Sequence, residues 1–356
     1  MNNPSTCPHF PLCSGCTLTD IFNPPVWQDA KEFFRAHDIE PLLHTSGFSQ
    51  TRYKAKLAVR PGPEIGLFKK NTHDVLSIPN CLIHHDPINR AVEIIRKEMI
   101  SQKISPYNET TRLGQIRYIQ LFVHRTTNQI QLVLITTESL ELFCKSLLKY
   151  DLWHSIWQNI HPSATNRILS DRWEQIYGEP FLWQPINDHL IPFHPGAFAQ
   201  ANLPLFEKMI QKIQTWVKPN DKVLELYAGV GAIGLCLSPL VKQITLVENN
   251  PYAHLSYQQT PKPNITYQCT DAKLADFTNY DLIIVDPPRK GLDPTILPKL
   301  ESPQLIYISC GFESFKRDAQ NLLSIGWKLK EAHGYILFPG TNHVETLALF
   351  KRPTSS

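Results

Sequence analysis

The stretch DKVLELYAGVGAIG (221–234) decides the fold class of this chain. An apolar run, typical of a buried strand, leads into a loop in which Gly229, Gly231 and Gly234 have a G-x-G-x-x-G spacing. Glycines at this spacing let the backbone turn tightly and approach a bound ligand. The stretch therefore indicates an open sheet that holds its ligand at the carboxyl ends of its strands.

Several similar apolar runs follow, and a closing pair of strands comes last. They are QITLVENN, NITYQCTD, YDLIIVDPP and PQLIYISCG, then GWKLKEAHGYILFP and HVETLALFKR. Nearly continuous apolar runs are typical of parallel strands buried on both faces. An amphipathic helix is predicted ahead of them, over 194–217. We expect an α/β fold with a doubly wound, Rossmann-like domain at 186–356.

The chain before residue 186 has a different pattern. QLFVHRTTNQIQLVLITT predicts a hairpin, because two alternating runs are separated by Thr-Thr-Asn. PINRAVEIIRKEM (87–99) predicts a helix that begins at a proline. We expect a smaller α+β domain at 1–185, and no N-terminal β-barrel RNA-binding domain, because too few residues precede Cys7.

Composition places the chain among globular proteins. Its 356 residues suffice for two domains, with 42% hydrophobic and 19% charged residues and a net charge of +3. The sequence contains neither a signal-peptide pattern nor an apolar run of membrane-spanning length. We expect a cytoplasmic protein with no membrane association, and infer no obligate protein partner.

One basic stretch, TRYKAKLAVRPGPEIGLFKK (51–70), has six Lys or Arg residues and one Glu. Tyr53 and Phe68 lie among them, and basic groups mixed with aromatic rings suit RNA. An edge hairpin protected by lysines explains the same pattern.

Two further motifs narrow the range of candidate ligands. Glu248 follows Gly229 by 19 residues and can accept hydrogen bonds from ribose hydroxyls, which fits NAD as well as S-adenosylmethionine. In VDPPRKG, Asp286 ends a strand and Pro287-Pro288 forces a stiff, extended exit. A hydride-transfer enzyme has no evident use for this element. An enzyme that must hold a planar base beside a methyl donor does have a use for it. The alternative is that the element is an ordinary turn at the end of a strand.

Cys310 ends the run YISC, and Glu345 precedes the last apolar run. A thiol, a carboxylate and a methyl donor together suggest methylation at C5 of a uracil. Thiolate addition at C6 makes C5 nucleophilic, and a base must then remove the C5 proton. A strand-end cysteine by itself is more often a packing residue.

With these motifs the chain resembles the RNA (uracil-5-)-methyltransferases, most densely over 193–350 and again over the first hundred residues. The resemblance implies that Cys310 is the nucleophile and Glu345 the base. YKAK (53–56) is similar to the family's Tyr/Phe-Arg-Asn-Lys stretch, where the RNA-facing domain begins. The S-adenosylmethionine site implied by resemblance and glycine loop comprises Gln200, Tyr227, Gly229, Glu248 and Asp286.

The cysteines near the N-terminus follow C-x5-C-x2-C spacing, with a fourth cysteine in IPNCLIHH. The pattern is similar to that of family members with a 4Fe-4S cluster, which implies Cys7, Cys13, Cys16 and Cys81 as ligands. A zinc site is the main alternative. The remaining cysteines, apart from Cys310, are expected to be inert core thiols: Cys144, Cys236 and Cys269.

The chain departs from the family pattern after Cys310, where Gly311-Phe312 replaces the usual Asn-Pro. The orientation of the thiol or the target base at this turn is therefore in question. The expected substrate is an unpaired or flipped uridine of RNA, with 23S rRNA preferred and tRNA as the alternative.

Other classes of protein explain part of the pattern. An NAD-dependent oxidoreductase leaves DPPRKG and the pair of Cys310 and Glu345 without a role. A non-catalytic RNA-binding module explains only the basic stretch and the N-terminal cysteines. An amino-group methyltransferase with an Asp-Pro-Pro element needs no thiol.

Overall fold

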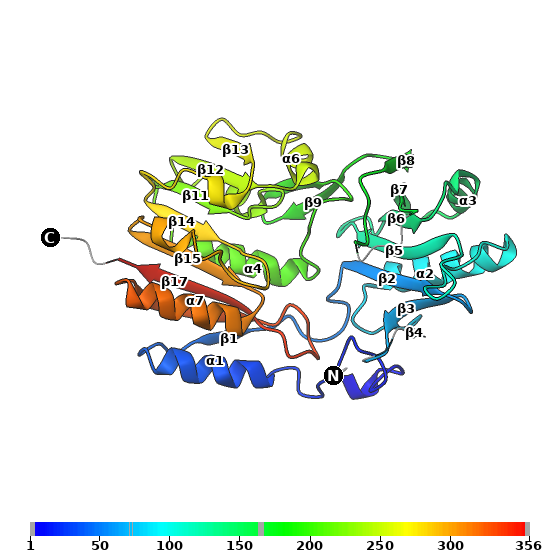
Figure 1. Cartoon of the computed structure of the whole chain (residues 1–356), viewed down its shortest axis with the longest axis horizontal. Helices are drawn as coiled ribbons and strands as arrows, with labels where there is room; N and C mark the ends of the chain where they lie inside the picture. Colours follow the sequence, from blue (N-terminus) through cyan, green and yellow to red (C-terminus); the bar gives the residue numbers. More distant parts are fainter. Residues whose placement is uncertain (1–3, 71, 73, 163–166, 353–356) are drawn as a thin grey trace. The chain divides into compact units, whose positions relative to one another are not determined.

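The computed structural model, which describes residues 4–70, 72, 74–162 and 167–352, comprises two compact units (Figure 1). The first comprises Met1–Ile21, Gly47–Gln184 and His194–Leu203, and the second Phe22–Ser46, Pro185–Phe193 and Pro204–Ser356. The chain thus passes between units several times rather than once at residue 185. The segment 22–46, expected in the first domain, belongs to the second unit, and 194–203 belongs to the first.

The second unit contains an eight-stranded sheet with the order β1-β16-β17-β15-β14-β11-β12-β13. The strands are β1 (Leu42–His44), β11 (Lys222–Leu226), β12 (Gln243–Glu248), β13 (Ile265–Cys269), β14 (Leu282–Val285), β15 (Gln304–Ser309), β16 (Lys328–Tyr335) and β17 (Glu345–Lys351). Strands β11 to β15 pair in parallel, and β17 lies antiparallel between β15 and β16. The predicted α/β fold is confirmed, and each apolar run of the sequence forms a strand.

All α-helices of the second unit bury apolar side chains. They are α1 (Pro25–Arg35), α4 (Leu203–Gln214), α5 (Ala232–Leu237), α6 (Pro251–Tyr257) and α7 (Phe312–Ser324), with 3-10 helices η3 (Ala272–Leu274) and η4 (Leu297–Lys299). Helices α1 and α7 contact each other through aromatic rings, such as Phe34 and Phe315, whose centroids are 5.7 Å apart. These rings share one core cluster with strand residues such as Leu305 and Val285.

The helix predicted over 194–217 begins only at Leu203. Residues before it form hydrogen bonds inside the first unit instead: Gln120 Nε2 donates to Pro195 O at 2.9 Å, and Tyr53 N–H donates to Ala201 O at 2.8 Å. The apolar periodicity of 194–202 thus belongs to an irregular segment, and the predicted helix start was wrong.

The first unit is built on a seven-stranded sheet with the order β4-β3-β2-β5-β6-β7-β8. All neighbours are antiparallel except β6 and β7, and the predicted hairpin is β5 with β6. The elements are β2 (Lys54–Arg60), β3 (Glu64–Phe68), β4 (Val75–Ser77), β5 (Ile116–Val123), β6 (Ile130–Thr136), β7 (Trp153–Ile160), β8 (Trp173–Gly178), α2 (Asp86–Ser101), α3 (Glu141–Ser146), η1 (Pro4–Thr6) and η2 (Leu147–Lys149). A separate pair comprises β9 (Leu182–Ile186) and β10 (His189–Phe193). Among the described residues, none of the helices is both long enough and apolar enough to cross a bilayer.

Candidate active site and candidate metal centre

Strand register brings Cys310 and Glu345 together at one end of the second unit's sheet. Ser309 at the end of β15 pairs with Thr346 in β17, so the next antiparallel pair is Cys310 with Glu345. Cys310 is half-buried, and Glu345 is only 6% exposed. The two residues lie 35 positions apart in the sequence, and their proximity is a property of the sheet.

Asp286 lies at the same edge, directly after β14. Val285 of β14 pairs in parallel with both Leu226 of β11 and Tyr307 of β15. The Asp286 N–H donates to Leu226 O at 3.4 Å. Because carboxyl ends of parallel strands meet at one edge, Asp286 lies near Cys310 on one side and near the end of β11 on the other.

Burial and neighbouring charges shift the pKa values of Glu345, Asp286 and Cys310. Burial, followed by the charge of Asp286, raises the pKa of the Glu345 carboxyl well above its usual value. Burial and the nearby Glu248 carboxylate raise the pKa of Asp286 to about 7. Burial and then the Glu345 and Asp286 carboxylates raise the pKa of the Cys310 thiol, while Arg289 opposes them. The thiol is therefore protonated at neutral pH, and an attack by its sulfur requires transfer of its proton.

The turn after Cys310 is stabilised without the Asn-Pro sequence of the family. Gly311 N–H donates to Ser309 Oγ at 3.2 Å, and Ser314 Oγ–H donates to Gly311 O at 2.9 Å. Phe312, at the start of α7, is 4% exposed and packs against Phe33 and Phe34. Two hydroxyls and a buried ring thus hold the turn.

Asp318 anchors the segments that carry Cys310 and Asp286, and sequence reasoning missed it. It is 1% exposed, and its Oδ2 accepts from Tyr307 Oη and from Leu292 N–H, both at 2.7 Å. The carboxylate thereby ties α7 to β15 and to the loop that follows Pro288. An acidic residue among the apolar residues of the segment FESFKRDAQNLL (312–323) was the available signal.

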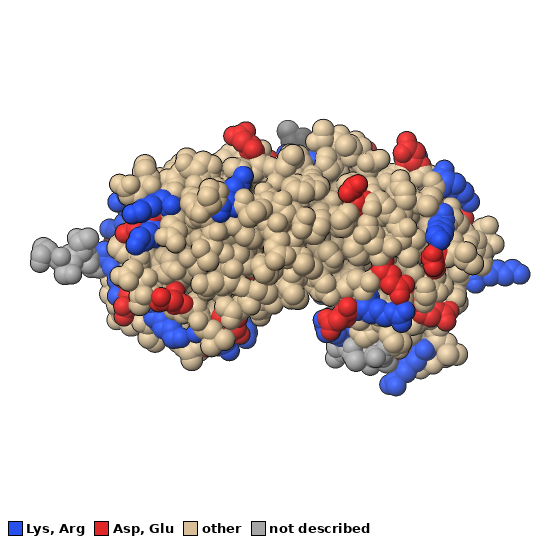
Figure 2. Space-filling model, turned by 90° about the horizontal axis from the view of Figure 1, so that it is seen from above, with Lys and Arg blue, Asp and Glu red and all other residues tan. Residues whose placement is uncertain are grey.

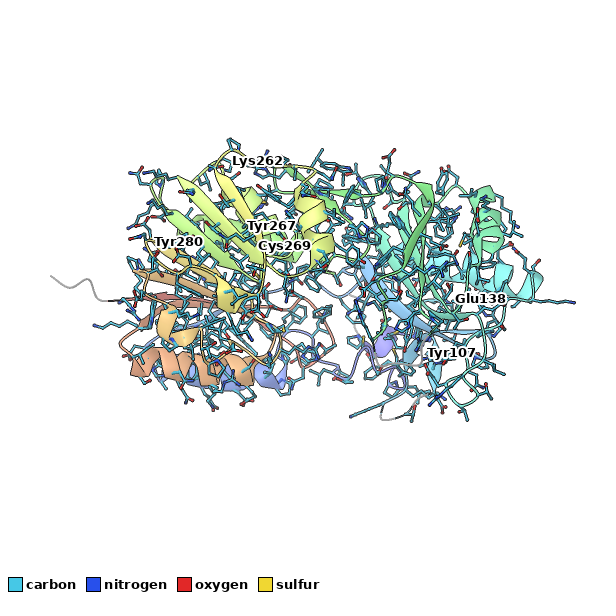
Figure 3. The ribbon with its side chains drawn as sticks, turned by 45° about the horizontal axis from the view of Figure 1, so that its top comes forward. Tyr107, Glu138, Lys262, Tyr267, Cys269 and Tyr280 are labelled. Carbon is cyan, nitrogen blue, oxygen red and sulfur yellow. The ribbon has the colours of Figure 1, made fainter. Side chains whose placement is uncertain are left out.

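The glycine loop after β11 adopts the conformation that its sequence requires. Gly229 and Gly231 have φ of 55° and 80°, in the left-handed region that favours glycine. A Cβ at Gly231 would lie 2.6 Å from Leu246 Cδ1, whereas one at Gly229 would meet no described atom within 4 Å. Tyr267 on β13 (Figure 3) donates its hydroxyl to Gly229 O at 2.7 Å. Gly231 is therefore required for packing, and Gly229 for the backbone turn.

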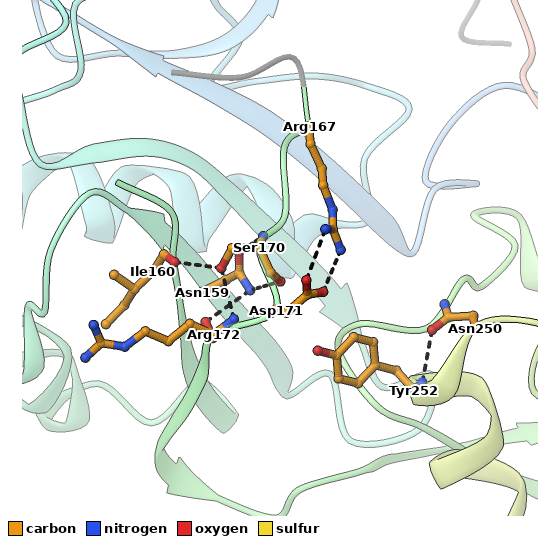
Figure 4. Close-up of polar contacts among 8 residues, drawn as sticks. All are labelled: Asn159, Ile160, Arg167, Ser170, Asp171, Arg172, Asn250 and Tyr252. Atoms are coloured by element: carbon orange, nitrogen blue, oxygen red, sulfur yellow. Dashed lines mark hydrogen bonds and ion pairs between the residues drawn. The ribbon is translucent and has the colours of Figure 1, made fainter. Parts of the chain in front are cut away.

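Glu248 orders the neighbouring backbone. Its Oε2 accepts from Gly229 N–H at 3.1 Å and its Oε1 from Asn250 N–H at 2.9 Å. The Asn250 side chain caps α6 by accepting from Tyr252 N–H at 3.0 Å (Figure 4). Each carboxylate oxygen can accept more than one hydrogen bond, so Glu248 can still accept from hydroxyls.

Tyr227 and Gln200 complete the predicted cofactor residues. Tyr227 follows β11 with a left-handed φ of 61°, beside the glycine loop. Gln200 is half-buried and belongs to the first unit, in the segment His194–Leu203, whereas the other predicted cofactor residues belong to the second.

Glu225 is a second residue that sequence reasoning missed. It is 3% exposed within β11, and its Oε2 has no hydrogen-bond partner among the described residues. Burial, followed by the charge of Asp286, raises its pKa to about 8. A carboxyl inside an otherwise apolar strand was the available signal, since such groups are rarely buried without a role or a partner.

The four N-terminal cysteines line one cavity of the first unit. Its lining residues are Cys7, His9, Phe10, Cys13, Gly15, Cys16, Arg52, Leu67, Ile78, Cys81, Ile83 and His84. Burial and the charges of the other three cysteines raise the pKa of Cys16 to about 12. Backbone N–H groups of Gly15 and of Ile83 and His84 point to the sulfurs of Cys13 and Cys81.

The arrangement of the four thiols bears on the predicted metal centre. No group of three or more His, Cys, Asp or Glu side chains in the described ranges is arranged to hold a metal ion. A zinc ion binds thiolates at about 2.3 Å, which requires them to gather closely. The four thiols nevertheless line one cavity, and the buried His9 Nε2 has no hydrogen-bond partner among the described residues.

The basic stretch 51–70 contributes fewer cations to the surface than expected. Lys54 Nζ donates to Ala197 O at 2.9 Å, and Arg60 forms an ion pair with Glu109 at 2.6 Å. Arg52 lines the cysteine cavity, so the exposed cations of this stretch are Lys56, Lys69 and Lys70. On the face shown in Figure 2, basic and acidic side chains are interspersed. The edge-hairpin alternative was wrong, because β2 and β3 are both internal strands.

The remaining cysteines differ from one another. Cys144 and Cys236 are buried as expected, whereas Cys269 at the end of β13 is exposed. The core assignment of Cys269 was therefore wrong.

Comparisons with known proteins identify similar sequences. A model of the tRNA (uracil-5-)-methyltransferase family matches residues 262–353. A protein of Protochlamydia amoebophila named as an uncharacterized RNA methyltransferase is 40% identical over 374 aligned positions, which cover 98% of this chain and 97% of the relative. A similarly named protein of Halalkalibacterium halodurans is 27% identical, and the match covers 96% of this chain and 82% of the relative.

A solved structure has a similar fold. The crystal structure of Pyrococcus abyssi tRNA (uracil-54, C5)-methyltransferase in complex with S-adenosyl-L-homocysteine matches with a TM-score of 0.81 at 24% identity. The match covers 96% of this chain and 86% of that chain.

Proposed function

We propose a specific reaction for this chain, which belongs to the RNA (uracil-5-)-methyltransferase family. The chain is accordingly an RNA methyltransferase that uses S-adenosylmethionine. This result excludes two alternative functions, those of an NAD-dependent oxidoreductase and of a non-catalytic RNA-binding module. The proposed reaction is methylation of C5 of a uridine, with Cys310 as nucleophile and Glu345 as base. The observation that carries it is the β15–β17 register, which brings these two residues together beside Asp286.

The proposed mechanism uses three side chains of the second unit. The Cys310 sulfur bonds to C6 of the uracil, and its proton passes to the Asp286 carboxylate, whose pKa of about 7 suits a proton acceptor near neutral pH. When bound, S-adenosylmethionine supplies an electrophilic methyl group, which C5 takes. Glu345 then removes the C5 proton, the bond between sulfur and C6 breaks, and the sulfur recovers its proton from Asp286. The balance is one methyl gained by the uridine and one proton released through Glu345.

The proposed cofactor site combines the glycine loop with the strand ends around it. Gly229 gives the ligand access to the backbone, and Glu248 accepts from ribose hydroxyls. Tyr227 and Asp286 lie at the ends of adjacent strands. Gln200 is proposed as a further contact on the strength of the resemblance alone.

The proposed RNA is 23S rRNA on the strength of the resemblance alone, and tRNA is the second candidate. The names of the matching family model and of the solved relative both specify tRNA, which supports the second. In either RNA the uridine must be unpaired or flipped out, because a thiol cannot reach C6 inside a stacked helix.

We also propose that Cys7, Cys13, Cys16 and Cys81 bind a 4Fe-4S cluster. Support comes from their common cavity and from the N–H groups directed at Cys13 and Cys81. Because the proposed mechanism needs no electron transfer, the cluster's proposed role is to order the N-terminal segment against the sheet of the first unit.

The experiment that tests the reaction uses RNA from cells that lack this gene. Purified protein is incubated with S-adenosylmethionine and either 23S rRNA or tRNA, and digested nucleosides are analysed by mass spectrometry. We expect 5-methyluridine in one of the two RNAs. Methylation of an amino group or a ribose hydroxyl without 5-methyluridine would refute the proposed chemistry, and the RNA that reacts selects the substrate.

A second assay tests the covalent step. RNA that contains 5-fluorouracil lacks the C5 proton, so the enzyme cannot complete elimination and should remain bonded to the RNA. We expect a denaturation-resistant complex with the wild-type protein and none with Cys310→Ala. A complex that persists in Cys310→Ala would assign the nucleophile to another residue.

A further inference from the structure

Arg52 is a charged side chain in a cavity otherwise lined by thiols, imidazoles and apolar groups. Among the described residues that line the four-cysteine cavity, Arg52 alone has a permanent charge, since a guanidinium stays protonated in proteins. Its charge acts on Cys13, Cys16 and Cys81. None of the described lining residues is Asp or Glu.

The backbone fixes Arg52 beside the fourth cysteine. Arg52 forms a parallel bridge with His84; its N–H donates to Ile83 O at 2.9 Å, and its carbonyl accepts from His85 N–H at 3.0 Å. The N–H groups of Ile83 and His84 in turn point to the Cys81 sulfur. Arg52 and Cys81 are therefore held together, although they lie 29 positions apart in the sequence.

We propose that Arg52 is the counter-charge for the iron–sulfur cluster, an inference that rests on the cluster proposed above. A 4Fe-4S core with four thiolates has a net charge of about −2 in its oxidised form. Burying such a charge is costly unless an opposite charge lies near it. Arg52 supplies that charge at a position fixed by the strand bridge, and it thereby retains the cluster and raises its reduction potential.

The test uses full-length protein purified anaerobically and reconstituted with ferrous iron and sulfide. Arg52→Gln removes the charge, and Arg52→Lys keeps it. Arg60→Gln is the matched control, because Arg60 is a buried arginine of the adjoining strand β2 that pairs with Glu109 and is not among the residues lining the cavity. Iron and sulfide per chain, the rate of iron release to a chelator and the midpoint potential of the cluster are measured for each.

We expect Arg52→Gln to release iron about 10- to 100-fold faster than wild type, the usual effect of losing a group that supports metal ligands. Its midpoint potential should be more negative, because the reduced cluster has the extra negative charge. Arg52→Lys should stay close to wild type, and Arg60→Gln should change neither quantity. If Arg52→Gln has the iron-release rate and the midpoint potential of the wild type, the counter-charge role of Arg52 is refuted, whereas the proposed cluster is not.

Two further outcomes are also decisive. Wild-type protein that binds no iron after reconstitution would refute the cluster, and the role of Arg52 with it. If Arg52→Gln does not fold, Arg52→Lys decides: rapid iron release or a strongly lowered potential despite the retained charge would refute the counter-charge role.

Discussion

The two cysteine sites of this protein use the same side chain in opposite surroundings. Cys310 lies beside the carboxylates of Glu345 and Asp286, with Arg289 as the opposing charge. The four N-terminal thiols share a cavity with Arg52, and none of its described lining residues is acidic. Both environments raise thiol pKa values through burial. The charges of the neighbours therefore differ: the Cys310 thiol lies beside carboxylates, whereas the N-terminal thiols share their cavity with a cation.

Replacing Cys310, which lies apart from the four N-terminal cysteines, should have the largest effect on the methylation rate. We expect Cys310→Ser to lower the methylation rate by at least about 10⁴-fold, because a hydroxyl is a far weaker nucleophile toward C6. The measurement is methyl transfer to RNA from labelled S-adenosylmethionine. The exposed Cys269→Ser serves as control and should keep full activity. Near-normal methylation by Cys310→Ser would place this residue among the packing cysteines.

Replacing Glu345, which lies opposite Cys310, should allow the thiol to add to the uracil but should slow its later elimination. We expect Glu345→Gln to slow turnover by about 10²- to 10⁴-fold, the usual contribution of a general base. Because the methyl transfer precedes proton removal, RNA–protein adducts should accumulate on natural RNA and be visible on denaturing gels. Glu313→Gln, an exposed change on α7, should behave as wild type. Slow turnover without adduct would assign Glu345 to binding rather than to proton removal.

Replacing one thiol of the cavity should affect metal content more than chemistry. We expect Cys81→Ser to lose most of the iron, about four atoms per chain in a full cluster, because serine is a poor ligand for this group. Iron analysis and visible absorption measure the loss. Cys144→Ser, a fully buried thiol in α3, is the matched control and should retain its iron. Unchanged iron in Cys81→Ser would remove this residue from the ligand set.

The smallest expected effect on activity comes from Glu225, which should instead change how the stability of the protein depends on pH. Its pKa rises from an ordinary 4.5 to about 8 on folding, so the folded chain binds the extra proton and stability is lost as pH rises through this range. Glu225→Gln removes the ionisation and should stabilise the protein by about 4 kcal/mol at pH 8, with little change at pH 4. Urea unfolding at the two pH values measures the difference. An equal effect at both pH values would show that packing, not ionisation, determines it.

The candidate site shows which features short-range patterns predict. Gly229, Asp286, Cys310 and Glu345 each stand at the end or the beginning of an apolar run, and a parallel sheet gathers such ends at one edge. Asp318 and Glu225 escaped prediction because their neighbours in sequence indicate an ordinary helix and an ordinary strand. Only the packing of α7 on β15, and the burial of β11, gives these carboxyls their unusual surroundings.

The sequence by itself determined the strands of the second unit, the glycine turn and the grouping of four cysteines in two segments, because hydrophobic periodicity and backbone restriction act over a few residues. Tertiary structure alone decided that 22–46 joins the second unit, that the helix begins at Leu203, and that Arg52, Lys54 and Arg60 contact internal partners. Those outcomes depend on hydrogen bonds and charges between residues far apart in the chain, which no local pattern encodes.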